Sequence, residues 1–193
     1  GAIAVAGSAA ASNIENFVYV SMNSVYSTAL AFTGQNVGAR RYERVGRVLY
    51  ICLAASTIAG VTLGVLSVVF AVPLLSIFIN PEGAPSVIAG VIAHGQLRLR
   101  VMCLPYFACG LMEVLVGVLR GMGDSLRPMI ISVAGACVLR ILWLYTVFAM
   151  FRTPEMLFAS YPVSWLLTTV AHYVLYLHLR KSMLSGQKLP IGA

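Results

Sequence analysis

The residue best suited to charge chemistry lies inside an apolar tract of the sequence. Glu113 precedes Arg120 by seven residues, which is about 10 Å along an α-helix at about 1.5 Å per residue. A carboxylate at that depth is costly to bury unless it is paired or serves a ligand. Tyr106 and Cys109 share its helical face, and Pro105 is expected to break the helix just before them. Glu113 is therefore a candidate functional residue, and a structural ion pair with an arginine is the alternative.

Polar side chains also recur along the first apolar tract, at intervals of 4, 3, 4, 3 and 7 residues. That period keeps them on one face of a helix. Because hydroxyl and amide groups are costly to bury without partners, the stripe favours a water-filled cleft, and a helix–helix seam joined by asparagines is the alternative. The stripe comprises Ser12, Asn16, Tyr19, Asn23, Tyr26 and Thr33, of which Asn16, Tyr19, Asn23 and Tyr26 are the cleft-lining candidates.

Two more polar residues belong with these sets. Glu15 is one residue off the stripe and lies either within the apolar tract or near its outer end. His172 lies in the middle of the last apolar tract, one turn from Thr168 and Tyr176. We count His172 among the cleft-lining candidates and expect a hydrogen-bonded structural histidine in preference to a proton relay.

The other reactive residues predict neither an enzyme nor a metal site. The sequence has no Ser/His/Asp grouping, no phosphate-binding glycine loop and no HExxH motif. Its four cysteines lie in apolar tracts without CxxC spacing or a neighbouring histidine, which favours simple packing; they are Cys52, Cys103, Cys109 and Cys137. We expect no catalytic residue, no metal and no cofactor.

Composition indicates the surroundings of these residues. Hydrophobic residues make up 60% of the chain and charged residues 10%, with a mean hydropathy of +0.89, whereas a soluble domain carries about 25% charged residues. Five apolar tracts reach the roughly 20 residues that a helix needs to cross a bilayer. The chain is therefore predicted to be an all-α polytopic membrane protein. The expected spans are residues 9–33, 48–79, 87–119, 126–150 and 156–179, and the second and third are long enough to tilt, kink or project from the membrane.

Basic residues distinguish the two sides of the membrane. With five spans, the segments 34–47 and 120–128 and the tail after residue 179 lie on one side, and they hold nine of the thirteen Lys and Arg residues. The opposite side has Arg152 and no basic residue in the loop 80–86. Because Lys and Arg stay cytoplasmic, the loops 34–47 and 120–128 and the C-terminus are predicted to be cytoplasmic. The loop 34–47 lacks the clustered basic and aromatic residues of a nucleic-acid surface, so no nucleic acid is expected.

The beginning of the chain has neither the basic region nor the cleavage site of a signal peptide. Five helices with a polar first helix make a poor complete membrane protein. We therefore expect residues 1–193 to be the C-terminal part of a longer protein.

Four segments together carry a family resemblance. They are "SNIENFVYVSMN" (12–23), "GQNVGARRY" (34–42), "LRGMGDSLRPM" (119–129) and "YPVSW" (161–165). Across essentially the whole chain they resemble the multidrug and toxic compound extrusion (MATE) transporters, especially bacterial members; the second and third motifs are the specific ones. The resemblance implies twelve helices in two six-helix lobes around a cleft, with this chain forming most of the C-terminal lobe and the N-terminal lobe absent from it.

The same resemblance implies an activity and a location. Members of the family export cationic or amphipathic small molecules, such as drugs and toxins, in exchange for Na+ or H+ by alternating access. The expected location is the bacterial plasma membrane. The expected partners are the lipid bilayer, small-molecule substrates and the chain's own N-terminal lobe.

Site residues transfer from the family only in part. In several relatives an acidic residue of the tenth helix takes part in cation coupling, and that position here is Cys109. Glu113 lies one turn closer to the cytoplasm on the same face and is expected to substitute for it. The coupling or substrate candidates are Glu113, Cys109, Tyr106 and Glu15.

The glycine-containing motifs are expected to form tight cytoplasmic turns or gates without touching substrate. Asp124 and Ser125 can cap the helix whose first turn contains Pro128. The motif residues are Gly34, Gln35, Asn36, Gly38, Arg120, Gly121, Gly123 and Asp124.

Two other functions remain open. A lipid-linked sugar flippase of related architecture would need more basic residues along its cleft, because its substrate is anionic. Here Arg140 is the candidate, and we expect it either to reach outward or to pair with an acid, with pairing preferred. A non-transporting membrane assembly subunit would instead use the polar stripe as a protein seam.

Overall fold

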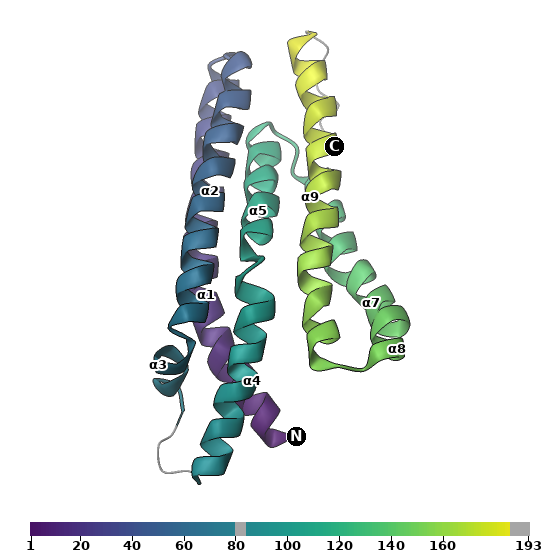
Figure 1. Cartoon of the computed structure of the whole chain (residues 1–193). Coiled ribbons are helices and arrows are strands. Elements are labelled where there is room, and N and C mark those ends of the chain that lie inside the picture. The colour runs from purple at the N-terminus through teal and green to yellow at the C-terminus, as the bar shows by residue number, and fades with distance from the viewer. Residues whose placement is uncertain (80–83, 186–193) are drawn as a thin grey trace.

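The computed structural model describes residues 1–79 and 84–185, and all regular structure in this part of the chain is helical. The helices form an elongated bundle (Figure 1). Their bounds are α1 (Ala2–Gly38), α2 (Glu43–Val69), α3 (Ala71–Ser76), α4 (Pro85–Cys103), α5 (Tyr106–Gly121), α6 (Leu126–Val133), η1 (Ala134–Val138), α7 (Leu139–Trp143), η2 (Leu144–Phe148), α8 (Ala149–Phe151) and α9 (Pro154–Leu184). The predicted all-α class is confirmed.

Two helices within the described ranges are long and apolar enough to cross a membrane. They are α2 and the continuous helix Leu126–Phe151, and α4 with α5 makes a third if the bent pair counts as one span. The other long helices, α1 and α9, have 37 and 31 residues but are less apolar. A multi-pass membrane protein is supported, while five spans stay a prediction.

Both overlong tracts are broken, which corresponds to the kink that the sequence offered beside tilting and projection. The α4–α5 pair bends by 45° at Leu104 and Pro105. Proline causes the break because it has no backbone N–H and its ring clashes with the preceding turn. The second tract is interrupted at Phe70, between α2 and α3. Of the loop predicted at 80–86, residues 80–83 lie outside the described part, as does Lys188 of the tail.

The predicted loop 34–47 is wrong in extent. Helix α1 continues to Gly38 and α2 begins at Glu43, so a short connection turns the chain, with Arg40 in the left-handed region at φ 56. Polar residues do not end a helix when their side chains reach solvent or bond to the helix itself. Asn36 does the latter, because its Nδ2 donates to the carbonyl oxygen of Phe32 at 2.7 Å.

Small residues allow α1 and α5 to pack backbone against backbone. A Cβ added at Gly117 would lie 2.7 Å from the carbonyl oxygen of Tyr26, and one at Gly121 would lie 2.8 Å from that of Leu30. Close contact through glycine is typical of helices in lipid, where no hydrophobic force draws them together. The α1–α5 contact therefore forms the centre of the bundle, with α2, α4 and α9 packed around it.

The helix Leu126–Phe151 lies at the edge of the bundle, beside α9 (Figure 1). It contains two π-helical stretches, η1 and η2, which flank the short α-helix α7. Such stretches change the direction of the side chains that follow. Most of its large apolar side chains are exposed, which suits a surface that faces lipid.

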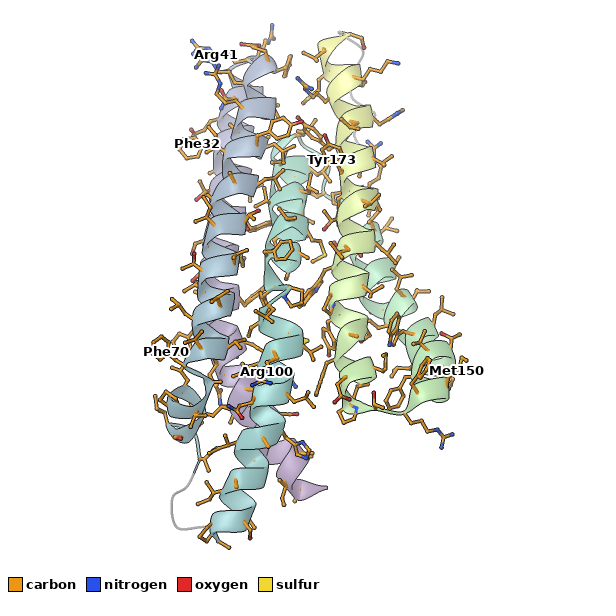
Figure 2. All side chains as sticks on the ribbon, in the orientation of Figure 1. Phe32, Arg41, Phe70, Arg100, Met150 and Tyr173 are labelled. Atoms are coloured by element: carbon orange, nitrogen blue, oxygen red, sulfur yellow. The ribbon has the colours of Figure 1, made fainter. Side chains whose placement is uncertain are left out.

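Figure 2 shows which labelled side chains lie toward each end of the bundle. Arg41 and Tyr173 lie toward one end, and Arg100 and Met150 toward the other. The α1–α2 connection and the C-terminal half of α9 share the first end (Figure 1), so the basic residues of these segments gather there. This placement agrees with the predicted separation of charge between two sides of the membrane.

Candidate functional site

A cavity of about 390 Å³ opens between α1, α5, the helix Leu126–Phe151 and α9. Its wall mixes aromatic, hydroxyl, amide and charged side chains. Such a volume falls within the roughly 300–1,000 Å³ of ligand pockets in proteins. The lining residues are Tyr19, Asn23, Tyr26, Met112, Glu113, Val116, Arg120, Ser132, Ala136, Arg140, Ser164, Trp165 and Thr168.

The polar stripe of α1 divides between the cavity and a helix seam. Tyr19, Asn23 and Tyr26 line the cavity. Asn16 is exposed and is not among the lining residues. Thr33 is fully buried, and its Cβ would lie 2.7 Å from a Cβ added at Gly121. The predicted cleft thus describes Tyr19, Asn23 and Tyr26. The alternative, a helix–helix seam, describes Thr33.

Glu113 of α5 lines the cavity and has no ion-pair partner among the described residues. Its neighbour in the wall, Arg120, uses one terminal nitrogen (Nη1) to donate to the Tyr26 hydroxyl at 2.8 Å, and its Cζ lies 5.9 Å from the Tyr26 ring centroid. Arg120 thus contacts the phenol of Tyr26. It does not form the ion pair with Glu113 that the sequence offered as an alternative. The carboxylate is open to a ligand.

Arg140 differs from its sequence-based expectation. Within the described ranges it has no acidic partner, and it turns inward rather than outward, because it lines the cavity. Its Nε donates to Ser164 Oγ at 3.1 Å, and its Cζ lies 4.0 Å from the Tyr161 ring centroid. A guanidinium over an aromatic face is stabilised by about 0.5–2 kcal/mol, which helps to hold the charge inside the bundle.

Tyr106 and Cys109 lie beside the cavity and are not part of its wall. Both are buried in an apolar cluster with Trp165, and the ring centroids of Tyr106 and Trp165 are 5.1 Å apart in an edge-to-face arrangement. Trp165 itself lines the cavity. These two coupling candidates therefore support the wall rather than form it.

Glu15 forms an ion pair with Arg98 outside the cavity. Its two carboxylate oxygens accept from the Nε and a terminal nitrogen (Nη2) of Arg98 at 2.8 and 2.9 Å. The Arg98 guanidinium also lies 5.4 Å from the Phe158 ring centroid. This buried pair joins α1 to α4, and neither residue lines the cavity.

His172 is placed in the core instead of the cleft. It is fully buried, and its Nε2 donates to the Pro128 carbonyl oxygen at 3.1 Å, with Ser132 Oγ at 3.4 Å. The bond joins α9 to α6. His172 is thus hydrogen-bonded within the core and absent from the cavity lining; the preference for a structural role over a proton relay stays a prediction.

The glycine motifs divide between helix and turn. Gly34 and Gly38 are helical, and Gln35 and Asn36 lie in the last turns of α1, so the first motif forms no turn. Gly123 does turn the chain, at φ 94. The Asp124 carboxylate accepts from the backbone N–H of Arg127 at 3.3 Å, whereas Ser125 makes no capping bond. Of the motif residues, Arg120 alone lines the cavity.

Sequence reasoning missed one feature of the wall. Arg120 was expected to form part of a turn motif, yet it contributes charge to the cavity. Arg140 was named as a basic cleft residue under the flippase alternative, from its place well inside an apolar span, and it lines the cavity as well. The described residues contain no group of three His, Cys, Asp or Glu side chains arranged to hold a metal.

Comparison with known proteins identifies the family. No curated protein matches the chain significantly. A family model described as MatE matches residues 1–146, which is more than half of the chain. That match contains three of the four segments on which the resemblance rests. The chain therefore belongs to the MatE family of membrane transporters.

Proposed function

We propose that this chain forms most of the C-terminal lobe of a twelve-helix antiporter that exports cationic or amphipathic small molecules in exchange for Na+ or H+. The observation that carries the proposal is the unpaired carboxylate of Glu113 in a cavity of about 390 Å³. Membership of a transporter family supports the general activity. The separation of basic residues supports a cytoplasmic α1–α2 connection. Five spans and a bacterial plasma membrane are proposed from the apolar tracts and from the resemblance to bacterial members.

The proposed mechanism is competition for one negative charge. Glu113 accepts either the coupling cation or the cationic group of the substrate, so the two exclude each other. Rocking of this lobe against an N-terminal lobe exposes the site to each side in turn. The aromatic residues Tyr19 and Trp165 in the same wall provide an apolar surface for the substrate's body.

The test uses Glu113→Gln in the complete transporter, which keeps the shape of the side chain and removes its charge. We expect normal insertion and loss of gradient-driven export of a cationic dye from vesicles. The matched control is Glu155→Gln, because Glu155 is an exposed acid in the first turn of α9 outside the cavity wall. Wild-type export by a well-folded Glu113→Gln protein would refute the proposed role of this carboxylate.

A lipid-linked sugar flippase is the second candidate, and one observation favours it. The cavity wall contains two arginines, Arg120 and Arg140, where the sequence predicted one. An anionic substrate requires such charges. Export of an anionic lipid-linked sugar by vesicles that fail to export a cationic dye would select this function.

A further inference from the structure

Arg180, near the C-terminal end of α9, has no acidic partner in the described part of the chain, where Arg98 and Arg127 form the ion pairs. Its side chain is half-buried against α2: a Cβ added at Gly46 would lie 3.4 Å from Arg180 Nη2 and 3.5 Å from the Tyr176 hydroxyl. The Nε of Arg180 and the Tyr176 hydroxyl are both buried, and neither has a hydrogen-bond partner among the described residues. Because a buried charge without a counter-charge is costly, this arrangement favours an anionic ligand.

The seam between α2 and α9 carries further polar groups beside Arg180. The hydroxyls of Tyr50 on α2 and Tyr173 on α9 are 3.3 Å apart, and Tyr50 is 56% exposed. One hydroxyl of this pair donates to the other, so the second O–H is free to donate to a ligand. Lys181 follows Arg180 and is exposed. Tyrosine, lysine and arginine are the side chains that gather where a membrane helix reaches the lipid headgroups.

The exposed face of α9 changes from apolar to basic over the thickness of one lipid leaflet. Val170, Val174 and Leu177 are exposed, and with Lys181 they recur every three or four residues, which places them on one helical face. Val170 and Lys181 are separated by about 16 Å at about 1.5 Å per residue, and half of a hydrocarbon core of about 30 Å is about 15 Å. A groove of about 430 Å³ lies at the basic end of this face, lined by Leu177, Arg180, Lys181, Leu184 and Ser185.

The surroundings of the seam are strongly basic. The α1–α2 connection and the C-terminal half of α9 share one end of the bundle (Figure 1), and Arg41 and Tyr173 both lie toward it (Figure 2). The chain there carries four arginines and one acid over eight residues, which are Arg40, Arg41, Glu43, Arg44 and Arg47. Charge of this sign favours lipids with a net negative headgroup over zwitterionic lipids.

We propose that the seam between α2 and α9 is a binding site for an anionic phospholipid. Arg180 and Lys181 bind the headgroup phosphate, and the free O–H of the Tyr50–Tyr173 pair donates to a headgroup oxygen. One acyl chain lies along the exposed apolar face that runs from Leu177 to Val170. None of these residues lines the central cavity, so the inference does not depend on the proposed transport activity.

The test uses a tryptophan placed at Leu177, which is 45% exposed beside the proposed headgroup site. The complete transporter is reconstituted in mixed vesicles of phosphatidylglycerol and phosphatidylcholine, in which one lipid or the other carries brominated acyl chains. Bromine quenches a tryptophan that it touches, and subtraction of the parent protein isolates the signal of Leu177→Trp. We expect phosphatidylglycerol to be preferred roughly 25-fold, because two bases should contribute about fivefold each, the equivalent of about 1 kcal/mol.

Three variants in the Leu177→Trp background assign the preference to the seam. Arg180→Gln and Lys181→Gln should each lower it about fivefold, because each removes one charge from the headgroup. Arg41→Gln is the matched control, an exposed arginine at the same end of the bundle. It should change the preference by less than about twofold, since solvent-exposed charges are screened over about 8 Å. A separate probe, Leu142→Trp on the exposed face of the helix Leu126–Phe151, should show no preference between the lipids.

Four results would overturn the proposal. Equal quenching of Leu177→Trp by the two lipids would show that the seam does not select an anionic headgroup, and quenching by neither lipid would show that protein covers it. A loss in Arg41→Gln as large as that in Arg180→Gln would replace the site with a diffuse basic surface. If Arg180→Gln fails to fold, the exposed Lys181 decides alone, and an unchanged preference in Lys181→Gln would refute the assignment.

Discussion

The ion pair between Glu15 and Arg98 connects α1 to α4, and its removal should destabilise the bundle measurably. The two side chains are only 9% and 19% exposed, and both carboxylate oxygens are used. Removing one partner from a buried pair costs about 3–5 kcal/mol, because the remaining charge is left without compensation. In a chain of roughly 150–250 residues, 1 kcal/mol lowers Tm by about 2–4 °C. Glu15→Gln should therefore lower Tm by about 6 °C or more.

A double-mutant cycle provides the assay. Glu15→Gln, Arg98→Gln and the double variant are unfolded by heat in detergent, and unfolding is followed with a thiol-reactive dye. Three buried cysteines report the transition once the exposed Cys137 is replaced by Ser. The double variant should lose less stability than the sum of the single variants, because it leaves no unpaired charge.

The exposed Glu43→Gln variant is the control for this cycle, and it should change stability by less than about 0.5 kcal/mol. Additive effects in the cycle, or a Glu15→Gln protein within about 1 °C of wild type, would show that the two residues are not coupled. The buried pair would then have no role in joining α1 to α4.

Three other predictions concern packing, topology and the cavity. Gly117→Val should destabilise the same thermal transition by about 1–3 kcal/mol, because its Cβ would lie 2.7 Å from the Tyr26 carbonyl oxygen; a neutral effect would contradict the tight α1–α5 contact. In intact cells, a cysteine at Arg44 should be shielded from an impermeant thiol reagent and one at Arg152 labelled, and the reverse result would invert the proposed orientation. A cysteine at Asn23, in the cavity wall, should react with a small water-soluble reagent while one at the buried Val18 should not; equal reactivity would argue against a hydrated cavity.

The helices could be predicted because their signals are local. Apolar tracts of sufficient length, and a proline that cannot continue a helix, act within a few residues of their own position. Pro105 accordingly marks the bend between α4 and α5. The end of α1 was missed for the same reason, because Gly34 and Gly38 resemble turn residues locally. They remain helical in the structure, and Arg40 makes the turn.

The cavity could be predicted in part. Tyr19, Asn23 and Tyr26 were found by their spacing, since a helical period fixes a common face whatever the neighbouring helices are. Whether His172 lies in the cavity wall or in the core depends on which helix packs over its face of α9. No local sequence pattern contains this information. Its bond to the Pro128 carbonyl oxygen spans two helices that are far apart in sequence.

The two key charges of the cavity, Glu113 and Arg140, are positioned by different forces. Glu113 lies on α5, whose position against α1 is set by the close backbone contacts at Gly117 and Gly121. Arg140 lies on the helix Leu126–Phe151, which is attached to α9 by polar contacts. They run from His172 to Pro128, from Arg140 to Ser164, and from Trp143 to the Met156 carbonyl oxygen at 2.7 Å.

Apolar side chains add little to that second attachment in lipid, because lipid tails are as apolar as the side chains themselves. Hydrogen bonds and the contact of Gly135 with Thr168 must therefore determine where the helix Leu126–Phe151 docks. Such contacts join residues that are distant in sequence and depend on individual side-chain geometries. The position of Arg140 in the same cavity wall as Glu113 is thus a property of the assembled bundle, and the number and hydropathy of the helices do not determine it.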